Sequence, residues 1–197
     1  MALTIEQMAA LCQTINDNYR NDSARYMWRN LKLVPEAVAE LRRMPLEGDT
    51  SPKNQIEVLE LMLECVDECS IPRQVLDIRR YQLSLYPLLS ADESPEPERS
   101  EVENAIRKLE DYIDLSIPMD EWCKRYHRHL RFDPVERTPE WEQHIYEAEQ
   151  ETDRRLGDTP RSMGFCFAYW STLRAVMAEQ GIEWRSPGIM NPGVMFD

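Results

Sequence analysis

The stretch that decides the fold is the last part of the chain, Thr159–Asp197, which reads TPRSMGFCFAYWSTLRAVMAEQGIEWRSPGIMNPGVMFD. Thr159 can cap the free amides of a helix, and Pro160 suits the first helical position because its missing N–H costs no hydrogen bond there. Apolar residues cover more than one side of the segment that follows. The sequence therefore predicts a helix over residues 160–180 that is buried around most of its circumference.

The same stretch carries its own stop signal. Gly181 is placed to end the helix in a left-handed conformation, with Ile182 against Met177 as in a Schellman motif. The chain then turns extended and passes through two Pro-Gly turns within 186–193. We expect this tail to fold back over its neighbours, with the rest of the protein packed around the helix.

Helical periodicity runs through most of the remaining chain, with apolar residues at spacings of three and four. Residues 4–7 fit a capping box, Pro35 is typical of a helix start, and Thr138-Pro139 predicts another. No stretch alternates with period two for long enough to predict a strand. We expect an all-α fold, a multi-helix bundle of about eight or nine helices built partly from αα-hairpins, with an extended C-terminal tail packed on the core.

The domain organisation is predicted as one helical domain over 1–197. A division into two lobes at the acidic linker 90–100, which is rich in Pro, Ser and Glu, is the alternative. The tripeptide at 70–72 recurs at 116–118, each time between two apolar-striped helices. This echo is typical of two similar αα-hairpins, one on either side of the linker.

Composition narrows the class of protein. A net charge of −13 argues against a general nucleic-acid binder, which must neutralise phosphates, and against attraction to an anionic membrane. The N-terminal residues lack the basic and apolar regions of a secretory signal, and the apolar run in 163–170 is far shorter than the roughly 20 residues that span a bilayer. Five cysteines without a framework of short spacings are typical of reduced thiols. We expect a cytoplasmic protein.

Two cysteine-containing pairs are the best metal candidate. Cys65 with Cys69, and Cys123 with His127, are each spaced by four residues, so each pair would share a face of a helix. Thiolates and imidazole are zinc ligands, which gives a metal-dependent enzyme or a zinc-stabilised protein as one alternative. Free cysteines are more often small core residues, so we expect no bound metal and no cofactor. The motifs of common catalytic sites are absent from the sequence, and we assign no catalytic residue.

A dense basic run occupies residues 124–131 and includes both His127 and His129. It is interpreted as a solvated helix face that answers neighbouring carboxylates rather than as a contact to nucleic acid. The acidic balance of the whole chain leaves a further alternative, an acidic inhibitor or DNA mimic that acts on a nucleic-acid-binding protein.

The C-terminal region provides the remaining functional hypothesis. Trp, Tyr, Met and Arg are enriched at protein interfaces, and these types gather in the last helix and the tail. The residues that we assign to partner binding are Tyr169, Trp170, Trp184, Arg185, Met190 and Phe196. Docking of the tail on its own domain is the competing interpretation. The sequence favours a non-enzymatic protein–protein interaction or adaptor module, with a protein partner or a second copy of the chain as the ligand.

Overall fold

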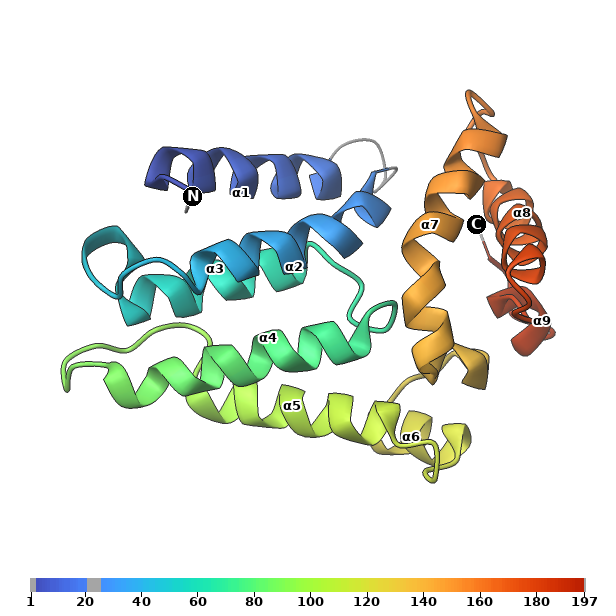
Figure 1. The fold of residues 1–197 in the computed structure, drawn as a ribbon. Helices are drawn as coiled ribbons and strands as arrows, with labels where there is room; N and C mark the ends of the chain where they lie inside the picture. Colours follow the sequence, from blue (N-terminus) through green and yellow to red (C-terminus); the bar gives the residue numbers. More distant parts are fainter. Residues whose placement is uncertain (1–2, 21–25, 197) are drawn as a thin grey trace. The chain divides into compact units, whose positions relative to one another are not determined.

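The computed structural model describes residues 3–20 and 26–196, and these residues form helices, turns and loops without a β-strand. Nine α-helices and four short 3-10 helices are present in the described part of the chain (Figure 1). The prediction of an all-α multi-helix fold is therefore confirmed. Within the described residues, no helix combines the length and the apolar character needed to cross a membrane.

The chain divides into two compact units, Met1–Glu110 and Asp111–Asp197. The first contains α1 (Ile5–Arg20), α2 (Asn30–Leu41), α3 (Pro52–Glu64), α4 (Pro72–Leu85) and most of α5 (Arg99–Ile113). The second contains α6 (Met119–Arg125), α7 (Pro139–Leu156), α8 (Phe165–Glu179) and the short α9 (Pro187–Met190). The acidic segment 90–100 lies inside the first unit, where it leads from the 3-10 helix Tyr86–Leu88 into α5.

In the first unit, helices that follow one another in the sequence lie side by side (Figure 1). Helix α2 packs against α1, α3 and α4, and these three helices bury its apolar residues. The fully buried residues Val34, Ala37, Ile56 and Leu59 come from α2 and α3. Helix α5 is tied to the unit by ion pairs from Arg80 to Glu110 and from Lys108 to Glu68.

Two local start signals are confirmed, and one is wrong. Thr4 and Gln7 exchange side-chain to backbone hydrogen bonds of 2.9 and 3.2 Å ahead of α1. Thr138 accepts a 3.2 Å bond from the amide of Trp141 at the start of α7. Pro35, by contrast, lies inside α2. The 3-10 helix Met27–Arg29 leads directly into α2, so the helix is already established when the chain reaches this proline, and its ring does not start a new element.

The second unit is built around a buried arginine and a cluster of aromatic rings. The guanidinium of Arg137, which is 2% exposed, donates to the backbone oxygens of Asp111, Tyr112, Asp114 and Ile117. The carbonyls at the end of a helix have no donors of their own, so Arg137 completes the C-terminus of α5. The Tyr112 ring packs against those of Trp122 and Phe132, with centroids 5.1 and 5.2 Å apart.

Helix α8 departs from the sequence prediction at its start and in its burial. It begins at Phe165 rather than at Pro160, because Gly164 adopts a left-handed conformation (φ 82°) that a continuous helix cannot contain. Leu173, Val176 and Met177 are its buried residues, whereas Phe167 is 53% exposed. The predicted burial around most of the circumference is therefore wrong. Helix α8 packs against α7 along one face.

The end of α8 agrees with the prediction. Gly181 has φ 80°, its amide donates to Ala178, and the Ile182 amide donates to Met177 over 2.9 Å. These two bonds form the Schellman motif expected from the sequence. The tail beyond it packs on the second unit through the buried side chains of Ile182 and Trp184.

Candidate protein-binding surfaces

Three aromatic rings meet on the outer side of α8 and define what we call the aromatic patch: Phe167, Trp170 and Phe196. Trp170 lies edge-to-face with both others, with centroids 5.5 Å from Phe167 and 5.0 Å from Phe196. Gly188 of α9 lies against the same rings, because a Cβ atom added there would be 3.4 Å from the Trp170 ring and 3.5 Å from Phe167. Met195, next to Phe196, is 90% exposed. The rings of the patch are already held in place by one another and by α9. Little conformational entropy would therefore be lost when a partner binds.

The tail that completes this patch is held by buried polar groups. The side-chain amide of Asn191 donates to the carbonyls of Arg131 and Pro187 and accepts from the Arg131 amide, each over 2.8 Å. Trp184 is buried against Trp141, and its indole N–H donates to Glu136 over 2.7 Å. These bonds fix the path of the tail at two points, which explains how an apolar C-terminal segment keeps a defined position.

The six residues assigned to partner binding fall into different environments. Trp170 and Phe196 meet in the aromatic patch, and Met190 is half-buried in α9. Trp184 lies inside the second unit, where it fixes the tail. Arg185 is held by Asp133, whose carboxylate accepts from both the Arg185 amide and its guanidinium over 2.8 and 2.9 Å. The structure thus separates the two patch rings from the two residues that anchor the tail.

Tyr169, the sixth of these residues, turns its hydroxyl inward. Burial, followed by the negative charge of Glu149 on α7 and a hydrogen bond to that carboxylate, raises the pKa of Tyr169 well above its ordinary value. The neutral phenol therefore contributes to the α7–α8 contact.

The proposed metal residues do not share helix faces. Helix α3 ends at Glu64, so Cys65 and Cys69 lie in the turn beyond it, and α6 ends at Arg125, before His127. The sequence-based assumption of two continuous helices is therefore wrong. Burial raises the pKa of both Cys65 and Cys123, which favours thiols over the thiolates that bind zinc. In the part of the chain described here, no group of three or more His, Cys, Asp or Glu side chains could hold a metal ion.

The basic run at 124–131 is engaged with nearby carboxylates. Arg125 pairs with Asp111 at 2.5 Å and with Glu121 at 2.8 Å, and Arg131 pairs with Asp120 at 3.1 Å. These pairs fit the interpretation of a solvated surface that answers its acidic neighbours.

Sequence reasoning missed a groove in the first unit. It has a volume of about 530 Å³ and lies between one face of α1, including Ala9, Cys12 and Tyr19, and one face of α3, including Val58 and Leu61. The residues of each set recur at helical spacing in the sequence, three or seven residues apart. A sequence does not show which apolar stripe a neighbouring helix covers, so the pattern alone does not reveal a groove.

A buried asparagine sets the separation of the two groove helices. Asn30, which is fully buried, donates from its side-chain amide to the carbonyls of Ile15 in α1 and Cys65 after α3, each over 2.9 Å. Its own side-chain oxygen accepts from Asn18 over 3.0 Å. Ile15 and Cys65 also line the groove, so the same residues that form its floor are fixed by Asn30.

Comparison with protein-family models, with curated proteins and with solved structures found no match to this chain.

Proposed function

We propose that this protein is a protein–protein interaction module that self-associates through the aromatic patch of α8 and the tail. The observation that carries the proposal is the preorganised ring cluster in which the exposed Phe167 lies beside the half-buried Trp170 and Phe196. Aromatic side chains held in a fixed geometry lose little conformational freedom on binding, which makes them effective interface anchors.

The distribution of charge favours a second copy of the chain as the partner that binds the aromatic patch. Residues 159–178 form the longest segment of the sequence without Asp or Glu, although the chain has a net charge of −13. A two-fold interface brings one patch against the same patch, so any carboxylate within it would face its own copy. Over 159–196 the acidic residues are Glu179 and Glu183, and Glu179 pairs with Arg155 over 2.7 Å. This surface suits self-association in an otherwise acidic molecule.

The test is the mass of the full chain in solution over a concentration series, measured by light scattering after gel filtration. We expect a concentration-dependent species of twice the 23.3 kDa chain mass. Phe167→Asp should return it to the monomer by placing a charge in the patch. Leu115→Asp is the matched control, because Leu115 is 57% exposed in the same unit but outside the patch.

Both variants should keep the far-ultraviolet circular dichroism of the parent, since both side chains are solvent-exposed. A monomeric parent at every concentration would overturn the proposal, as would a Phe167→Asp dimer equal in stability to the parent dimer.

A further inference from the structure

We propose that the groove between α1 and α3 binds an amphipathic helix of a partner protein that carries Lys and Arg along one side. This inference concerns the other unit of the chain and does not depend on self-association through the aromatic patch. It is drawn from the shape of the groove, the exposure of its walls and the charge beside it.

The groove has the form that a helix requires. Its floor is apolar and fixed, because Ile15 and Met62 are buried and Asn30 holds the backbone on either side. Its α3 wall ends in Leu61, which is 62% exposed, and its α1 wall includes the half-exposed Tyr19. From Ala9 to Tyr19 the α1 wall is about 15 Å long, which matches about three turns of a docked helix. Apolar residues at i, i+3 or i+4, and i+7 of such a helix would face the floor.

A second hollow of about 500 Å³ adjoins the groove and shares Leu61 and Glu64 with it. Apart from Leu61 and Pro97, the residues that line it are glutamates: Glu57, Glu60, Glu64, Glu96 and Glu101. The α3 side of the groove is therefore acidic along its length, and we call this set the glutamate rim.

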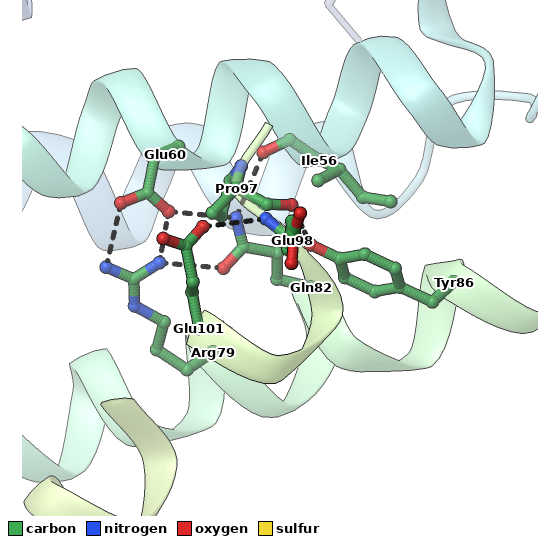
Figure 2. A network of polar contacts seen from close by, with 8 residues as sticks. All are labelled: Ile56, Glu60, Arg79, Gln82, Tyr86, Pro97, Glu98 and Glu101. Atoms are coloured by element: carbon green, nitrogen blue, oxygen red, sulfur yellow. Dashed lines mark hydrogen bonds and ion pairs between the residues drawn. The ribbon is translucent and has the colours of Figure 1, made fainter. Parts of the chain in front are cut away.

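One rim carboxylate, that of Glu60, already has a cationic partner within the chain, as Figure 2 shows. Glu60 pairs with Arg79 of α4, and Gln82 donates to both Glu60 and the Ile56 carbonyl over 3.2 and 3.0 Å. These contacts lower the pKa of Glu60 against the opposing effect of burial, which is the largest single influence. Glu60 thus ties α3 to α4 and stays ionised.

Other rim carboxylates are available to a ligand. Glu64, Glu96 and Glu101 form no salt bridge with another described residue, and the Glu57 carboxylate lies 4.0 Å from Lys53, at the limit of an ion pair. Glu101 accepts a hydrogen bond from the Glu98 amide, also drawn in Figure 2. A helix with Lys or Arg on the side that faces α3 would pair with these groups, whereas an acidic helix or a nucleic acid would be repelled.

Arg20 of α1 is the basic residue that lines the groove among the described residues. It is the last residue of α1 and favours one acidic or polar position at that end of the bound helix. This asymmetry would fix the direction in which the helix lies.

The test is a selection from a displayed library of helical peptides, three to four turns long, in which apolar and charged positions are randomised. The bait is the full chain. We expect the enriched peptides to carry net positive charge with apolar residues at i, i+3 or i+4, and i+7. A selected peptide should bind Leu61→Asp at least tenfold more weakly than the parent, and its affinity should fall as salt is raised.

Glu64→Lys tests the charge of the rim and should weaken binding of the same peptide. Leu88→Asp is the control, because Leu88 is 54% exposed in this unit and lies outside the groove. The bound peptide should also slow alkylation of Cys12, which lines the groove. The proposal is overturned if no peptide is enriched, if the enriched peptides are neutral or acidic, or if Leu61→Asp binds them as the parent does. A Leu61→Asp change that lowers the mass of the chain in solution would instead assign the groove to a second copy and overturn it as well.

Discussion

Replacing Arg137 with methionine should destabilise the second unit by more than the loss of a surface ion pair would. The guanidinium is buried and donates to four backbone oxygens, of Asp111, Tyr112, Asp114 and Ile117. Methionine fills a similar volume and has no donor. Asp114 is exposed, so water can replace the guanidinium there, but Tyr112 is buried and Asp111 is only partly exposed.

The magnitude follows from those two carbonyls. A buried acceptor left without a partner costs about 1–3 kcal/mol, so the pair costs about 2–6 kcal/mol. Part of this is offset, because burial disfavours the charged guanidinium, as the lowered pKa of Arg137 shows. We expect a net loss of about 2–4 kcal/mol, a large part of the stability of a small domain.

Urea denaturation followed by near-ultraviolet circular dichroism measures this loss, because Trp122 and Tyr112 pack together beside Arg137. Arg137→Lys keeps the charge but not the planar fork, so it should recover only a small part of the stability. Arg125→Met is the control: it removes an exposed pair to Asp111 and should change the midpoint little. A methionine variant within about 1 kcal/mol of the parent would refute the reasoning, and a fully stable lysine variant would refute the role of the fork.

Three further outcomes are expected. Asn30→Ala leaves the Ile15 and Cys65 carbonyls and the Asn18 amide without their partner, and should lower the free energy of unfolding by about 2–4 kcal/mol in urea titrations. Gly181→Ala places a side chain at φ 80° and should cost about 1 kcal/mol in thermal melts, whereas Gly188→Ala, where φ is not positive, should cost less. Burial and the nearby Glu60 raise the pKa of Tyr86 to about 12, above its ordinary 10, and its neutral hydroxyl donates to Pro97 over 2.6 Å. Because the folded pKa is the higher one, this contribution to stability is complete below pH 10 and is lost as the pH rises towards 12. The stability difference between the parent and Tyr86→Phe should therefore shrink over that window, and an unchanged difference would contradict it.

Local signals in the sequence located helix ends well where the residues involved are close together in the chain. The Thr4–Gln7 box, the Thr138 cap and the Gly181–Ile182 closure each depend on groups within five residues of one another. Their geometry is largely set by the backbone of one turn, so the residue types suffice to predict it. Pro35 shows the limit of such signals, since the same residue type is compatible with a helix that has already begun.

Burial was not predictable in the same way. The apolar residues of α8 suggested a helix enclosed on most sides, but α7 and the tail cover only part of it. An exposed apolar face and a buried one have the same composition, and what distinguishes them is the position of elements far away in the sequence. Each unit is held together by one buried polar residue, Asn30 in the first and Arg137 in the second. Their hydrogen bonds reach residues 35 and 25 positions away in the sequence, so no short sequence pattern predicts them.

The two proposed surfaces differ in a way that makes their combination informative. Two of the three rings of the aromatic patch, Phe167 and Trp170, lie in the longest segment without carboxylates, whereas the groove is bordered by glutamates, so the two surfaces suit different ligands. A dimer formed through the patch would carry two grooves. Once one basic helix of a two-helix partner is bound, its second helix would bind the other groove intramolecularly. A monomer has one groove and cannot provide this gain. Phe167→Asp should consequently weaken the binding of a tethered double peptide while leaving the affinity of the single peptide unchanged, and Leu61→Asp should weaken both.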